Sequence, residues 1–296
     1  MSIITAVQGA LSLLTLWFAA VFFSHANKNK DKMSDAGWGI LSAIGFITNF
    51  FDTLGIGSFA PTTALFRAFK LVPDRLIPGT LNVSMTIPVV VEALIFMTVI
   101  KVDPMTLIAL VAASVVGAVF GAGVVSHLPE KKIQLGMGVS LIIVAFIFVA
   151  GLMNWMPVGG EAIALEGTAL MIGVVGNLIL GALMTIGIGL YAPCMALVYA
   201  LGMSPKVAFP IMMASCAFLM PAASIKFVKE SAYDIKASIA ITLAGVVGVF
   251  IAAYIVKELP LEILKWVVVA VVTYTGATLI RSGLKNPGTQ SVGEKA

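Results

Sequence analysis

Charged residues are scarce in this sequence and make up only 11% of its 296 residues. A soluble domain has about a quarter, so this scarcity excludes a soluble enzyme, a disordered chain and a nucleic-acid-binding protein. The two cysteines, Cys194 and Cys216, lie in apolar segments, and no disulfide framework is expected. Histidine is limited to His25 and His127, and no metal-ligand, P-loop or nucleophile motif is present in the sequence. We therefore expect no catalytic residue, no bound metal and no cofactor.

Apolar residues are abundant instead, at 60% of the chain with a mean hydropathy of +1.07. This predicts an all-α integral membrane protein in contact with the lipid bilayer, because a spanning helix needs about 20 mostly apolar residues. Two shorter apolar stretches, 59–70 and 190–201, are each about 17 Å long as helices and cover half of the hydrocarbon core. We predict that these two are re-entrant half-helices. The segments that qualify as nine full spans are 3–23, 37–56, 77–100, 105–126, 133–153, 167–188, 207–227, 236–256 and 261–281.

The distribution of Lys and Arg predicts the topology. Cytoplasmic loops carry an excess of these residues, so we place the basic loop 24–36 inside and fold each half-helix back toward the side from which it came. All Lys and Arg then lie inside except Lys101, Lys206, Lys257 and Lys265. Half-helices that crossed the membrane fully would move basic clusters outside. We therefore predict a multi-pass protein of a prokaryotic inner membrane, with an external N-terminus and a cytoplasmic C-terminus.

The sequence contains an internal repeat. With a shift of 132 residues, the segment 55–61 falls on 187–193, and both read G-I-G-x-[FY]-A-P. Downstream prolines match in the same register, and after the loss of one residue Asp103 falls on Asp234. The predicted topology starts the two repeats on opposite sides of the membrane, so they are inverted, as in many transporters. The resulting division is a peripheral helix and basic loop at 1–33, a first repeat at 34–154, an external loop at 155–165, a second repeat at 166–283 and a cytoplasmic tail at 284–296.

The repeated glycine motif predicts an anion site. Paired glycines allow a sharp turn and a close approach of backbone to ligand, and the half-helix that follows begins with unpaired amides and a positive dipole. The alternative is a purely structural role, in which these glycines only allow close helix packing. The substrate-binding residues that we select in and near the two motifs are Gly55, Gly57, Ser58, Thr80, Asn82, Gly187, Gly189, Tyr191 and Ser215.

Two acidic residues lie within predicted spans, where charged side chains are costly and usually functional. Asp52 lies three residues before Gly55, and Glu92 lies deep in the span 77–100. The second repeat has no acid at either place, so the site is expected to be asymmetric. We predict that one or both carry a coupling proton. The alternatives are an interfacial position for Asp52 and a structural hydrogen bond for Glu92.

This arrangement resembles the sulfite exporter TauE/SafE family of membrane permeases. The resemblance lies in the Gly-rich turn before a short helix in each half, in the run 72–83 (VPDRLIPGTLNV) and in the run 203–208 (MSPKVA), and it covers about 36–282. It implies transport, usually outward, of sulfur oxyanions such as sulfite or of organic sulfonates. The residues agree with this, and we expect a proton-coupled secondary transporter that exports a small sulfur anion.

Other functions remain open at this point. A carrier of a carboxylate has similar needs, and Asp52 and Glu92 facing one cavity would favour a metal cation instead. A passive channel and a membrane assembly partner without cargo are further alternatives, and a sealed interior would favour the latter. A homo-oligomer is compatible with all of these.

Overall fold

The computed structural model describes residues 3–96, 102–156, 159–255 and 262–285, and within these ranges it contains no β-strand. Two 3₁₀ turns, Lys30–Lys32 and Asp74–Leu76, accompany the α-helices. The predicted all-α class is confirmed. The α-helices are α1 (Ile3–Lys28), α2 (Trp38–Thr53), α3 (Phe59–Ala68), α4 (Ile77–Phe96), α5 (Pro104–Val125), α6 (Glu130–Leu152), α7 (Gly167–Met184), α8 (Tyr191–Ala200), α9 (Pro205–Lys229), α10 (Ile235–Ile255) and α11 (Glu262–Lys285).

The lengths of these helices separate them into two groups. Eight of them are long and apolar enough to cross a membrane, namely α1, α4, α5, α6, α7, α9, α10 and α11. The helix α2 is shorter, at 16 residues, and α3 and α8 have 10 residues each. The two short helices begin within a residue of the predicted starts of the half-helices, which are positions 59 and 190. The end of the predicted span 77–100 lies outside the described residues.

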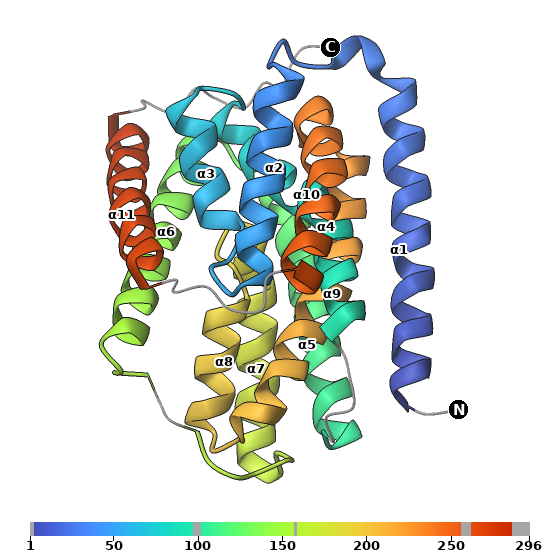
Figure 1. Cartoon of the computed structure of the whole chain (residues 1–296), viewed down its shortest axis with the longest axis vertical. Helices are drawn as coiled ribbons and strands as arrows, with labels where there is room; N and C mark the ends of the chain where they lie inside the picture. Colours follow the sequence, from blue (N-terminus) through green and yellow to red (C-terminus); the bar gives the residue numbers. More distant parts are fainter. Residues whose placement is uncertain (1–2, 97–101, 157–158, 256–261, 286–296) are drawn as a thin grey trace.

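Two helices form the centre of the bundle, and the others surround them. The most buried helices are α4 and α9, which pack against each other, whereas most of the surface of α1 is exposed. Figure 1 shows α1 at the edge of the bundle. One polar contact that holds it there is at its C-terminal end, where Nδ1 of His25 lies 2.8 Å from the Tyr233 hydroxyl.

The helix contacts show an exchange pattern, in which contacts made by one half of the chain reappear with the corresponding helices of the other half. The helix α2 packs on α10, and α5 packs on α7; α4 packs on α10, and α5 on α9. If α2 to α6 are matched in order with α7 to α11, the contact of α2 with α10 corresponds to that of α7 with α5. In the same way, the contact of α4 with α10 corresponds to that of α9 with α5. The contacts of α6 with α11 and of α4 with α9 map onto themselves. This is the arrangement expected of two related halves.

Glycines allow the helix backbones to approach closely in the pairs α5–α7 and α2–α10. A Cβ on Gly117 of α5 would overlap the Leu178 carbonyl oxygen of α7, and one on Gly181 of α7 would overlap the Ser114 carbonyl oxygen of α5. Between α2 and α10, a Cβ on Gly248 would lie 2.5 Å from the Phe46 carbonyl oxygen. Small residues therefore bring these backbones together, as is common between membrane helices.

Gly117→Ala is expected to destabilise the protein. The added methyl group meets backbone and not a flexible side chain, so α5 and α7 must separate, which costs about 2 kcal/mol or more. Thermal unfolding of the purified protein in detergent measures the effect. Gly9→Ala in α1 is the matched control, because nothing lies within 4 Å of its added Cβ. Equal melting temperatures for the two variants would contradict this account of the packing.

The two aspartates that the repeat aligns both cap helices. The Asp103 carboxylate accepts from the Thr106 amide at 2.8 Å at the start of α5, and this hydrogen bond lowers the pKa of Asp103. The Asp234 carboxylate accepts from the Ala237 amide at 2.8 Å at the start of α10, and also from the Ser34 hydroxyl at 3.1 Å. Each aspartate therefore begins the fourth helix of its series.

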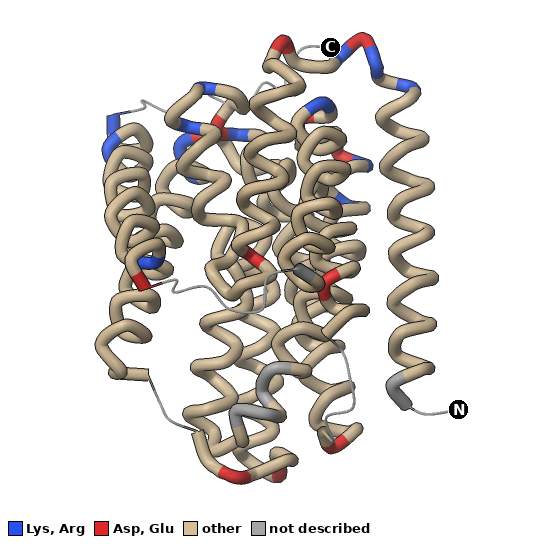
Figure 2. The backbone as a smooth tube through the Cα atoms, in the orientation of Figure 1, with Lys and Arg blue, Asp and Glu red and all other residues tan. Residues whose placement is uncertain are grey.

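Charge is divided between the two ends of the bundle. Figure 2 shows most Lys and Arg at the end that carries the segment between α1 and α2, whereas the loops at the opposite end carry Asp and Glu. The segment 154–166, at the opposite end, contains Glu161 and Glu166 and no Lys or Arg. The bundle is therefore electrically asymmetric along its axis.

Candidate functional site

A cavity of about 530 Å³ lies where the two glycine motifs come together. Its wall includes residues 55–60 from the first motif and residues 189–193 from the second. The remaining lining comes from α2, α4, α6, α7, α9, the later part of α8, the first turn of α11 and Met156 beyond the end of α6, and most of it is apolar.

The first motif turns the chain sharply between α2 and α3. Gly55 and Gly57 have φ of 93° and 83°, in the left-handed region that glycine adopts without strain. Ser58 then starts the short helix, and its hydroxyl donates to Asp52 Oδ2 at 2.7 Å. Pro61 lies in the first turn of α3, where a missing N–H is harmless.

The second motif makes the corresponding turn between α7 and α8. Gly187 has φ of 115°, and Gly189 has open space around the position of a Cβ. Leu190 starts the short helix, and its carbonyl oxygen accepts from the Cys194 amide at 2.9 Å. Pro193 again lies in the first turn.

The N-terminal ends of α3 and α8 face the same cavity. The two helices occupy opposite halves of the bundle in Figure 1, and their first residues lie toward its middle. The first backbone bonds at these ends are donated by Thr62 in α3, at 3.1 Å, and by Cys194 in α8. The first two residues of each helix line the cavity, and their amides precede the first of these bonds. Both dipoles therefore place partial positive charge there.

Two carboxyl groups also lie in the cavity wall. Asp52 and Glu92 are each only 3% exposed. Asp52 is held by Ser58, whereas Glu92 Oε2 has no hydrogen-bond partner. The Tyr191 hydroxyl is near the Cys216 thiol but makes no hydrogen bond of normal geometry. Unsatisfied buried polar groups of this kind indicate a place for a ligand, an ion or water.

Four of the residues selected from the sequence do not line this cavity. The Thr80 hydroxyl donates to the Leu76 carbonyl and accepts from the Asp234 amide at 2.9 Å. Ser215 accepts from Asn177 at 2.9 Å. Asn82 donates to the Pro78 carbonyl at 2.8 Å, and its amide oxygen is unpartnered. Gly187 forms part of the second turn but is not a lining residue of the cavity. The selected residues that do line the cavity are Asp52, Gly55, Gly57, Ser58, Glu92, Gly189 and Tyr191.

The structure adds cavity residues that sequence reasoning missed. Lys265 in the first turn of α11 lines the cavity, although the topology assigned it only to the external end of the last span. Its one sequence signal is that it is a lysine within an apolar span. Cys216 lies in the wall together with five methionines, Met156, Met184, Met195, Met212 and Met213. In the described part of the chain, no group of three His, Cys, Asp or Glu is arranged to hold a metal ion.

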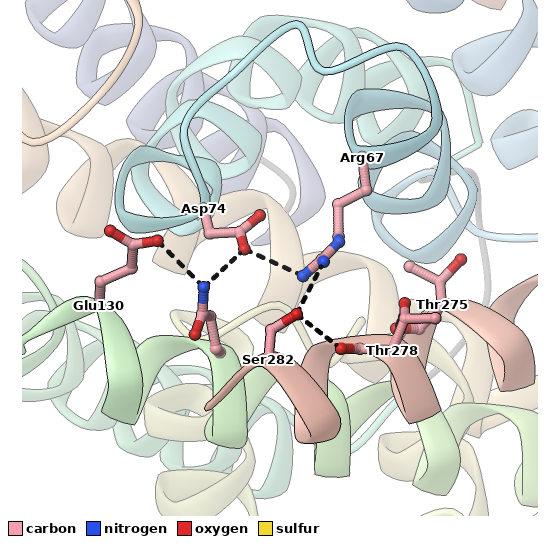
Figure 3. Close-up of polar contacts among 7 residues, drawn as sticks. Arg67, Asp74, Glu130, Thr275, Thr278 and Ser282 are labelled. Carbon is pink, nitrogen blue, oxygen red and sulfur yellow. Dashed lines mark hydrogen bonds and ion pairs between the residues drawn. The ribbon is translucent and has the colours of Figure 1, made fainter. Parts of the chain in front are cut away.

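A polar cluster joins α3 to its neighbours at the basic end of the bundle. Arg67 forms an ion pair with Asp74 at 2.9 Å and donates to the Ser282 hydroxyl of α11 at 3.3 Å. Gln134 of α6 donates to Asp74 at 2.9 Å and to Glu130 at 3.0 Å. Figure 3 shows Arg67 extended between Asp74 and Ser282. The cluster therefore ties α3 to α6 and α11, away from the cavity.

A scan of protein-family models matches residues 2–148 and 169–295 to the family described as sulfite exporter TauE/SafE. The chain belongs to the sulfite exporter TauE/SafE family. The resemblance seen in the sequence is confirmed, and the family consists of transporters and not of enzymes. Together with the eight apolar helices, membership makes the chain a multi-pass membrane protein of a family that transports sulfur anions such as sulfite. The comparisons with curated proteins and with solved structures found no match.

Proposed function

We propose that this chain is a secondary carrier that exports a small sulfur anion, sulfite or an organic sulfonate. The observation that carries the proposal is the convergence of two matched glycine turns and two helix N-termini on one cavity. The anionic group binds between the first turns of α3 and α8, where backbone amides and helix dipoles favour negative charge. The Tyr191 hydroxyl lies in the same wall without a hydrogen-bond partner and supplies a further donor.

The proposed topology follows from the charge division. The basic end of the bundle faces the cytoplasm, because cytoplasmic loops are rich in Lys and Arg. With this placement the N-terminus is external, α1, α2, α4 to α7 and α9 to α11 cross the membrane, and α3 and α8 are re-entrant. The exchange pattern of helix contacts supports two inverted repeats, α2 to α6 and α7 to α11.

With the basic end in the cytoplasm, the cavity extends toward the external side of the membrane. Its wall includes the C-terminal ends of α4 and α6, the end of α8 and the start of α11, which all point away from the basic end. The helix α3 packs on α11, and the Arg67 cluster reinforces that contact at the basic end. We take this as the outward-facing state, in which α3 closes the cytoplasmic side. Transport requires an inward-facing state in which this contact opens.

Proton coupling is the proposed role of the two carboxyl groups. Glu92 is buried in the wall without a partner for Oε2, and Asp52 lies in the same wall. Two neighbouring carboxylates cannot both remain charged beside a bound anion without a large electrostatic cost. Binding a proton removes one of these charges, so proton and anion occupancy of the cavity are linked.

A metal cation is the second candidate cargo, because Asp52 and Glu92 do face one cavity. The helix N-termini and Lys265 in the same wall oppose a cation. A cavity of this size also disfavours an assembly partner with a sealed interior.

The experiment that tests the function is uptake into proteoliposomes. We expect saturable uptake of radiolabelled sulfite, with competition by small sulfonates and none by divalent cations. Purified protein should also melt at a higher temperature with the transported anion, because a ligand that binds the native state stabilises it. Competition by divalent cations alone, with no effect of any sulfur anion, would overturn the proposal in favour of the cation carrier.

A further inference from the structure

Lys265 is the single Lys or Arg in the cavity wall among the residues that the structure describes. It lies on the first turn of α11, one turn from the start of the helix at Glu262, and its side chain is partly exposed. In the described part of the chain, no carboxylate lies within ion-pair distance of it. Among these residues, its charge has no direct partner of opposite sign.

Lys265 lies on the side of the cavity that α6 and α11 form. The helix α11 packs along α6, and the neighbouring wall from α6 includes Gly151 and Leu152 at the C-terminal end of that helix. The glycine turns follow the ends of α2 and α7, and Figure 1 shows the start of α11 at about the same height in the bundle as the end of α2. An anion at the helix N-termini therefore shares one cavity with Lys265.

The carboxyl groups in the cavity wall make a positive charge there favourable for anion entry. Asp52 and Glu92 both lie in the wall, and either one repels an anion when it is ionised. The two helix N-termini contribute only about half an elementary charge each, and this falls off within the first turn. A full positive charge on Lys265, acting beside low-dielectric apolar walls, is felt over a longer distance than it would be in water.

We propose that Lys265 is a specificity-determining residue that attracts the anion into the cavity and excludes cations. The proposal rests on the transport of an anion proposed above. In this proposal, Lys265 contributes to the affinity for the anion, and other groups carry out the conformational change that follows binding. The ligand that Lys265 recognises is a small oxyanion, and sulfite is the probe that tests this.

The test compares Lys265→Gln and Lys265→Arg with the wild type for sulfite uptake in proteoliposomes. We expect the glutamine variant to raise KM about tenfold and to change the maximal rate less than twofold. The arginine variant should keep KM within about twofold, because it keeps the charge. Added salt should raise the wild-type KM more than that of the glutamine variant, since screening acts on the charge that the variant lacks. Lys132→Gln, at an exposed lysine outside the cavity, is the matched control.

The outcomes separate this inference from the proposed function. An unchanged KM in the glutamine variant, with normal transport, overturns the role of Lys265 and leaves the function standing. If the wild type moves no sulfite, that function fails, and Lys265 is tested by thermal shift with sulfate, thiosulfate and small carboxylates. Stabilisation by one of these anions that is lost in Lys265→Gln and kept in Lys265→Arg supports the role. Stabilisation that survives in Lys265→Gln, or none with any anion, overturns it.

Discussion

Gly189→Leu is expected to lower anion transport on the order of 100-fold, the loss that a small displacement in a binding site can cause, while the protein still folds. Nothing lies within 4 Å of a Cβ built at Gly189, and its φ is not in the left-handed region, so the backbone accepts a side chain. That side chain extends into the cavity, where it occupies the space before the first turn of α8. The anion is excluded from the amides there. Initial rates of sulfite uptake, with thermal unfolding measured in parallel, report transport and folding separately.

The matched control is Gly39→Leu. Gly39 also has nothing within 4 Å of its added Cβ, but it lies exposed near the start of α2 and away from the cavity. This variant should transport at the wild-type rate. Gly57→Leu is a less specific change, because its φ of 83° strains any residue with a side chain. Wild-type transport by a well-folded Gly189→Leu protein would place the anion elsewhere.

Glu92→Gln is expected to abolish accumulation driven by a pH gradient. If one proton is coupled to each anion, a gradient of one pH unit supplies about 1.4 kcal/mol and sustains a tenfold concentration ratio. Glutamine has nearly the shape of glutamate but cannot exchange a proton, so the ratio should fall to one. Exchange of labelled for unlabelled sulfite should continue, because the cavity and the helix N-termini are kept. Proteoliposomes with an imposed pH gradient measure both activities.

Asp52→Asn is the comparison variant for this prediction. Asp52 already accepts a hydrogen bond from Ser58, which asparagine can also accept, whereas Glu92 Oε2 has no partner. The unpartnered group is the better candidate for the proton carrier, so Asp52→Asn should retain gradient-driven accumulation in part. A Glu92→Gln protein that still accumulates sulfite tenfold per pH unit would show that the coupling ion does not bind at Glu92.

The sequence alone determined the features that depend on local chemistry. Long apolar runs predict membrane helices wherever they occur, and the breaks at Gly55 and Gly187 mark the turns because few other residues adopt such φ values. Hence the starts of α3 and α8 were predicted within a residue. The pairing of the two motifs at one cavity also follows the duplication that is visible in the sequence.

Only the tertiary structure decided which polar side chains share the cavity. These helices are apolar on nearly every side, so their patterns contain little information about which face points inward. Thr80 and Ser215 look as suitable in sequence as Ser58, yet their hydroxyls are used in helix contacts. Lys265 reaches the cavity from the last helix, because α11 packs along α6 and beside α3. Such proximity comes from the packing of distant helices, and no spacing within a single helix encodes it.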